Sequence, residues 1–151
     1  MASWSHIQDS IFGWELLQAL AWERIFRRKD ADPKTQHMFE QFEQRYSQPE
    51  AYGSALAHAH EARLECANLF RDCDVLLVPA AAGEAPEGIG NTGTGDTNFN
   101  GAWSMLRLPC LTLPMGLGSA GLPIGLQLVA RRGEDTTLLN AAAYVEACLT
   151  A

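Results

Sequence analysis

The sequence predicts an α/β fold in which a partial mixed β-sheet of about three strands, including a hairpin, is covered by about four helices. Three observations lead to this class. Apolar residues recur at helical spacing through residues 1–72. A short, β-branched apolar run ends in proline at residues 74–79, and two later apolar runs flank a glycine-rich connection. We therefore expect residues 1–72 to be helical and residues 73–151 to hold strands, a Gly-rich loop and a final helix.

The helices of the first part are predicted from their periodicity and their ends. One helical face would be formed by Ile11, Trp14, Ala21 and Ile25. Asp32 before Pro33 has the pattern of an N-cap and a first helical position, so a helix is expected over residues 34–46. Residues 47–50 (SQPE) fit a capping box and would open a helix that runs to about residue 71. Its apolar stripe would be Tyr52, Leu56, Leu64, Ala67 and Phe70.

The strands of the second part are short apolar runs. Residues 74–78 suit a strand buried on both faces, with further neighbours encoded elsewhere. Residues 80–101 are a long loop of the kind that more often serves a function. Residues 110–114 and 124–130, joined by a connection with three glycines, predict a hairpin. A last helix is expected from residue 134, with the buried stripe Leu138, Ala142, Val145 and Leu149.

Composition narrows the function classes. The net charge of −7, from 11 basic and 18 acidic residues, argues against a nucleic-acid partner. No apolar run is long enough for a membrane span, and we expect no signal peptide, and a cytoplasmic protein whose four cysteines are buried free thiols. No cofactor is expected. No metal site is expected either, because His58 and His60 point to different sides of one helix. The GxGxxG spacing at residues 88–93 lacks an adjacent strand and helix, so a loop is favoured over phosphate binding.

Four motifs in order resemble the C-terminal third of the amidase signature family. They are DVLLVP at residues 74–79, FNGAWSML at residues 99–106, LPCLTLP at residues 108–114 and GLPIGLQLV at residues 121–129. The last is the most specific, and with the upstream helices the resemblance covers nearly the whole chain. It implies a large mixed sheet wrapped by helices and cleavage, or glutamine-dependent transfer, at an amide bond by two relayed serines and a neutral lysine.

The resemblance places both serines and the lysine upstream of these motifs, so no catalytic residue is expected here. Two segments of this chain could be considered as replacements for the missing nucleophile and base, and neither fits. Residues 116–121 (GLGSAG) lie in the predicted hairpin turn and lack a double serine. The two lysines, Lys29 and Lys34, lie in a polar connection where a lysine stays protonated. The expectation is therefore a C-terminal amidase fragment, truncated or half of a split enzyme, that is inactive alone.

The resemblance also implies substrate-binding residues in the loop that borders the family's pocket. These are Thr92, Phe99, Asn100 and Trp103. An asparagine amide can pair with a substrate amide, while aromatic rings exclude water. For Phe99 and Trp103 the alternative is a local apolar contact on a short helix. The partner would be a small amide substrate, once an N-terminal amidase segment completes the site. There are two alternatives. One is a non-catalytic binding or self-assembly module that forms a homo-oligomer through exposed sheet or helix faces. The other is a remnant without function.

Overall fold

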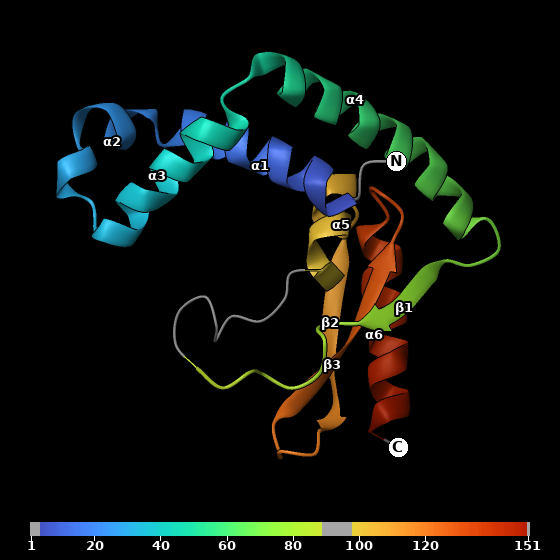
Figure 1. Cartoon of the computed structure of the whole chain (residues 1–151). Helices are drawn as coiled ribbons and strands as arrows, with labels where there is room; N and C mark the ends of the chain where they lie inside the picture. Colours follow the sequence, from blue (N-terminus) through green and yellow to red (C-terminus); the bar gives the residue numbers. More distant parts are fainter. Residues whose placement is uncertain (1–3, 89–97, 151) are drawn as a thin grey trace. The chain divides into compact units, whose positions relative to one another are not determined.

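The computed structural model describes residues 4–88 and 98–150, which divide into two compact units, Met1–Glu61 and Ala62–Ala151. Figure 1 labels their elements. The first unit contains α1 (Trp4–Ala19), α2 (Ala21–Phe26), the 3₁₀ turn η1 (Arg28–Asp30), α3 (Pro33–Tyr46) and most of α4 (Pro49–Cys66). The second contains the end of α4, η2 (Ala67–Phe70), β1 (Val75–Pro79), α5 (Asn98–Leu106), β2 (Cys110–Leu117), β3 (Pro123–Ala130) and α6 (Asp135–Leu149).

The first unit is held by close packing of α1 on α3. A Cβ on Gly13 would lie 2.1 Å from the Tyr46 ring, so only glycine allows α1 to approach this closely. Phe12 and Phe42 meet edge to face with their centroids 6.2 Å apart. The start of α3 is fixed as predicted, because the Asp32 side chain accepts hydrogen bonds from the backbone N–H groups of Lys34 and Thr35.

The predicted stripe of the first helix is wrong, and the stripe predicted along α4 and η2 is confirmed at Phe70 alone. The first helix breaks at Leu20, and Ile25 remains 59% exposed, while the buried positions of α1 are Gly13 and Leu17. Along α4 and η2 the buried line is made of small residues and one aromatic: Ala55, Ala59, Ala62, Cys66 and Phe70. Leu64, expected in that line, is 63% exposed. The prediction weighted side-chain size, whereas small side chains let a helix lie closer to its neighbours.

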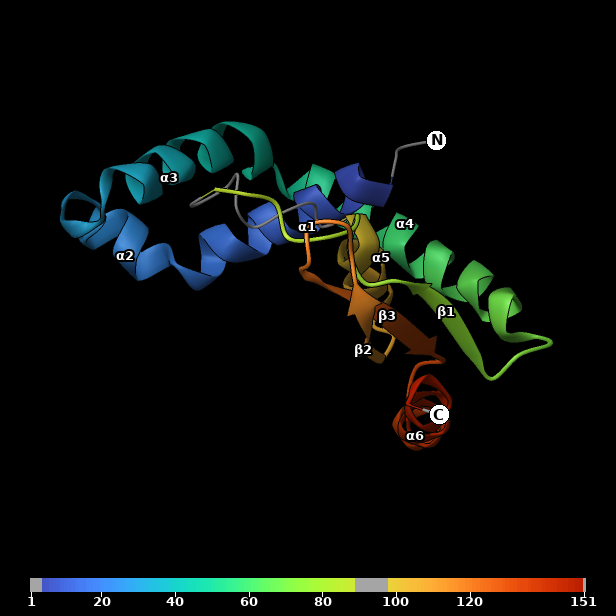
Figure 2. The same ribbon diagram turned by 90° about the horizontal axis from the view of Figure 1, so that it is seen from below.

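The second unit is built on an antiparallel three-stranded sheet in the order β1–β3–β2. The β2–β3 hairpin is confirmed, with Leu113 opposite Leu126, and a register shift lies between Pro114 and Gly116. β1 pairs with the other edge of β3, with Leu77 opposite Leu128. In Figure 2, α6 lies on one face of this sheet and α5 on the other.

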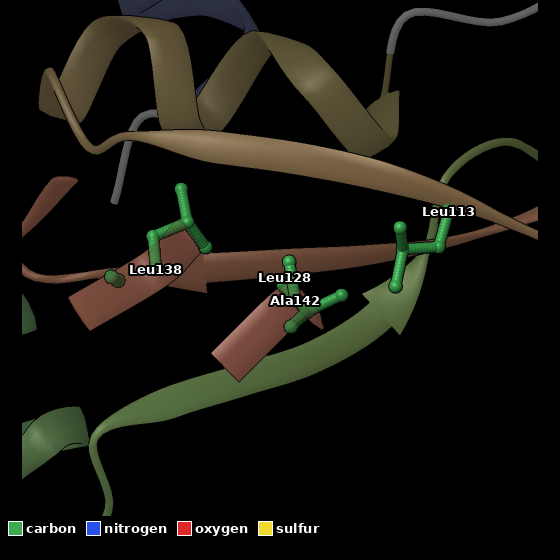
Figure 3. Close-up of a cluster of buried hydrophobic side chains, with 5 residues drawn as sticks. Leu113, Leu128, Leu138 and Ala142 are labelled. Atoms are coloured by element: carbon green, nitrogen blue, oxygen red, sulfur yellow. The ribbon is translucent and has the colours of Figure 1, made fainter. Parts of the chain in front are cut away.

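The core of the second unit lies between the sheet and α6. Figure 3 shows Leu113 and Leu128 from the strands gathered with Leu138 and Ala142 of α6. Ala130 completes the buried cluster. Alternate residues of β3 point to opposite faces, so Gln127 and Val129 lie on the α5 side. Full burial of Leu128, at 0% exposure, contributes about 1.5–3 kcal/mol relative to an exposed side chain.

The predicted α/β class, three strands, hairpin and final helix are confirmed. Six α-helices are present in the described part of the chain, where about four were expected. All pairings among the described strands are antiparallel, so the parallel pairing of a mixed sheet is not formed within them. β1 is a strand at the edge of this sheet and Leu77 is 55% exposed, so the expected burial of both its faces is not met. Leu149, expected in the buried stripe of α6, is 42% exposed.

None of the helices in the described residues is long and apolar enough to cross a membrane.

Candidate functional site

An apolar pocket of about 460 Å³ opens where β1 ends beside the β2–β3 hairpin. Its lining is Leu77, Val78, Pro79, Ala81, Ala82, Gly83, Phe99, Met115, Ile124, Gly125 and Leu126. Three segments therefore form its walls: the end of β1 with the residues after it, the first turn of α5, and the hairpin. Apolar walls of this kind hold the hydrophobic part of a small ligand and exclude water.

The segment after β1 is held against the hairpin by backbone contacts. The Ala80 N–H donates to the Gly125 carbonyl at 3.1 Å, one residue past the end of β1. A Cβ on Gly125 would lie 2.7 Å from the Thr112 methyl group and 3.0 Å from the Ala80 Cβ. Gly125 is therefore required by space, which explains a glycine inside a strand.

A chain of amide groups lies beside the pocket. Asn100 Nδ2 donates to the Ala80 carbonyl at 3.3 Å, and Gln127 Nε2 donates to Asn100 Oδ1 at 2.7 Å. A backbone carbonyl can only accept, so Asn100 must present its NH₂ to Ala80 and its oxygen to Gln127. Gln127 must then give its own NH₂, which leaves its oxygen turned elsewhere.

That oxygen, Gln127 Oε1, is buried and accepts no hydrogen bond from the described residues, and the residue is 4% exposed. A buried acceptor without a donor costs about 1–3 kcal/mol. The described residues supply no donor for this oxygen. The sequence did not single out Gln127 beyond its place in the GLPIGLQLV motif. A glutamine on an otherwise apolar strand was the available signal.

The four expected substrate-binding residues differ in their placement. Phe99 lines the pocket. Asn100 does not line it, and both ends of its amide are bonded to Ala80 and Gln127. Trp103 lies on the same helix but outside the lining, and its carbonyl accepts from the Leu108 N–H at 3.0 Å. Thr92 lies outside the described residues, as does most of the GxGxxG segment at residues 88–93.

The GLGSAG segment at residues 116–121 contains the end of β2 and most of the hairpin turn, as the sequence favoured. The Ser119 hydroxyl donates to Glu84 Oε2 at 3.3 Å, so a carboxylate contacts it. The backbone N–H groups of Ala120 and Leu122 also hydrogen bond to Glu84, and they lower the pKa of its carboxyl group. Lys29 and Lys34 are exposed.

The thiols differ from the expectation that all are buried. Cys66 is buried, Cys73 is half-buried, and Cys110 and Cys148 are exposed. Desolvation nevertheless raises the pKa of Cys110, whose Sγ contacts the Leu108 carbonyl at 3.6 Å. A raised pKa disfavours the reactive thiolate.

No group of three His, Cys, Asp or Glu that could hold a metal ion occurs among residues 4–88 and 98–150.

The sheet and its helices form an α/β fold that is shared with solved amidases. A structure described as a crystal structure of amidase matches 97% of this chain and 35% of its own, with a TM-score of 0.78 and 22% identity. A second, described as a vestigial protein complex that reveals the origins of an s-triazine catabolic enzyme, matches 93% and 33% at a TM-score of 0.75 and 23% identity. These likenesses establish the fold.

Sequence similarity establishes the family. Residues 15–139 match the family model described as Amidase, and the chain belongs to the Amidase family. One subunit of the glutamyl-tRNA(Gln) amidotransferase from Wolinella succinogenes is 34% identical over 83 residues, which are 52% of this chain and 18% of that protein. The chain thus spans less than a fifth of this relative and about a third of the solved amidase.

Proposed function

We propose that these 151 residues act as the C-terminal segment of an enzyme that hydrolyses a carbon–nitrogen amide bond, and that they do not hydrolyse amides alone. The single observation that carries the proposal is the family match over residues 15–139 in a chain whose two lysines are both exposed. The nucleophile, its serine partner and the lysine would come from a segment outside these residues, on the same or on a separate polypeptide.

The pocket supports a role in binding the substrate. Its walls are apolar, and Phe99 gives it one aromatic wall. We propose that Phe99, Asn100, Trp103 and Thr92 border a small amide substrate once the catalytic segment is in place. Asn100 would act by holding the Ala80 carbonyl beside the pocket, since both ends of its amide are already bonded.

The test is an amidase assay of the purified chain with acetamide and benzamide, alone and co-expressed with the N-terminal segment of an amidase of this family. We expect no turnover alone and turnover in the co-expressed sample. Hydrolysis by the chain alone that is lost in Ser119→Ala would contradict the proposal.

A self-assembly module is the second candidate, favoured by the apolar side chains that the chain exposes. Leu117 is 69% exposed on the hairpin and Tyr144 is 73% exposed on α6. The relative from Wolinella succinogenes is one subunit of an amidotransferase, and one structural neighbour is described as a protein complex, which is consistent with assembly. Light scattering tests this second candidate by measuring the molar mass of the chain in solution. A monomer at every concentration tested would rule out self-assembly. A dimer that is dissociated by Leu117→Ser and Tyr144→Ser would support it.

A further inference from the structure

The strongest unexplained feature outside the amide chemistry is the contact of Glu84 with the hairpin tip, residues 118–122. Both carboxylate oxygens of Glu84 accept hydrogen bonds from this tip. The Ala120 N–H lies 3.0 Å from Oε1 and 2.9 Å from Oε2, and the Leu122 N–H lies 2.8 Å from Oε1. The Ser119 hydroxyl donates at 3.3 Å to Oε2.

The tip is shaped to receive a carboxylate. The Gly118 N–H donates to the Leu122 carbonyl at 2.9 Å, and the Gly121 N–H donates to the Gly118 carbonyl at 3.1 Å. Gly121 has a φ of +79°, which an L side chain rarely adopts. These inner bonds leave the N–H groups of Ala120 and Leu122 to converge on one acceptor. Backbone N–H groups grouped in this way form an anion-binding concavity.

Gly118 gives a separate indication that the space is reserved for the carboxylate. A Cβ at this position would lie 2.3 Å from the carboxyl carbon of Glu84 and 2.6 Å from Oε2. Any side chain at residue 118 would therefore displace Glu84.

The contact also closes the pocket wall. Ala81, Ala82 and Gly83, directly before Glu84, line the pocket, and Met115 and Ile124 line it from the two strands that lead to the tip. The segment after β1 is bonded to the hairpin at its start through Ala80 and at its end through Glu84. Between these two points it spans the pocket.

We propose that the hairpin tip is a carboxylate-binding site and that Glu84 occupies it as a latch that positions the pocket wall formed by residues 81–83. The latch goes beyond the proposed function, because it concerns the shape of the pocket and needs no catalytic partner. The tip residues carry no titratable side chain, and the other acidic residue near Glu84 in its own described segment is Glu87. The hydrogen bonds from the Ala120 and Leu122 N–H groups lower the pKa of Glu84, so the latch is charged at neutral pH and is released as the pH falls through the lowered pKa.

The experiment is hydrogen exchange of the whole chain, followed by NMR at the backbone N–H groups of Ala120, Leu122 and residues 81–83. Glu84→Ala should speed exchange at Ala120 and Leu122 by about tenfold or more, since their acceptor is lost, and at residues 81–83 by less. Sodium formate, a carboxylate small enough for the vacated site, should slow exchange again in Glu84→Ala. Glu87→Ala, a matched loss of a nearby carboxylate, should leave these rates unchanged.

Gly118→Ala provides a test that keeps Glu84 in place. The new methyl group competes with the carboxylate, so exchange at Ala120 and Leu122 should rise in the wild-type background. In the Glu84→Ala background the space is vacant and the same substitution should add no further increase. Unchanged exchange in Glu84→Ala, an equal change in Glu87→Ala, no response to formate, or additive effects of the two substitutions would each overturn the latch.

Discussion

The two units of this chain are stabilised in different ways. In Met1–Glu61, rings and charges form the contacts. Phe42 meets Phe12 across α1 and α3 and Tyr46 within α3, and Glu43 of α3 pairs with Arg24 and Arg28. In Ala62–Ala151, an aliphatic cluster between the sheet and α6 forms the core, and Leu128 is completely buried. Aliphatic burial involves no titrating group, whereas ion pairs weaken when the carboxylate is protonated or when salt screens the charges. The difference predicts separate responses to substitution, pH and salt.

The largest effect is expected from Phe39→Ala in the first unit. Phe39 is 1% exposed and is the largest fully buried side chain of that unit. Removing a buried phenyl ring costs about 3–5 kcal/mol in free energy of unfolding. Hydrogen exchange should rise across α3 while β3 stays protected. Ile25→Ala, at a position 59% exposed, is the control and should change stability by less than about 0.5 kcal/mol. Equal loss of protection in both units would show that they unfold as one.

Leu128→Ala is the corresponding change in the second unit. It removes the centre of the cluster in Figure 3 and should cost about 2–5 kcal/mol, depending on how far the cavity closes. We expect faster exchange in β1, β2 and β3 with α3 unaffected, together with a lower urea midpoint for the loss of the sheet. Leu139→Ala, on the exposed side of α6, is the matched control. A loss of α3 protection in Leu128→Ala would contradict the separation of the units.

The second unit was also the easier one to predict. Short apolar runs and a glycine-rich connection identify strands and a hairpin, because the signal is local. Asp32 was predicted as an N-cap for the same reason. The buried stripe of α4 was missed, because helix periodicity does not tell a face of alanines from a face of leucines. Which face is buried depends on neighbours that are distant in the sequence.

The candidate site was predicted only in part for a similar reason. Phe99 lies in a recognisable motif and does line the pocket. Glu84 lies in a loop without any pattern, and its partners are 36 and 38 residues away. The bonded arrangement of Asn100 and Gln127 likewise depends on the strand register and on the position of α5. Local sequence therefore indicated the walls of the pocket but not the contacts that hold them.

A smaller effect of opposite sign is expected from Arg107→Gly in the second unit. Arg107 has a φ of +59° and ends α5, where the Arg107 N–H bonds to the Ser104 carbonyl and the Leu108 N–H to the Trp103 carbonyl. This is a Schellman motif, whose left-handed position favours glycine. Glycine relieves a strain of about 1–2 kcal/mol but adds freedom to the unfolded chain, for a net gain of about 0.5–1 kcal/mol. Arg107→Ala keeps the strain without the charge and should give no gain in thermal unfolding.

The smallest effect, and the one that separates the two units by pH, is expected from Glu43→Gln. The bonds from Arg24 and Arg28 lower the pKa of Glu43 below its ordinary value of 4.5. A depressed folded pKa means that the contribution of Glu43 is complete above that ordinary value and is lost as the pH falls through the lowered one. Because these side chains are partly exposed, the loss at neutral pH should be about 0.2–1 kcal/mol. Unfolding followed in α3 over a descending series of pH values tests this. Wild type and Glu43→Gln should differ at pH 7, the difference should shrink as the pH falls below 4.5, and high salt should narrow it at pH 7. A difference that does not shrink as the pH falls would mean that Glu43 acts through packing, and the contrast between a charge-bound unit and an aliphatic one would fail.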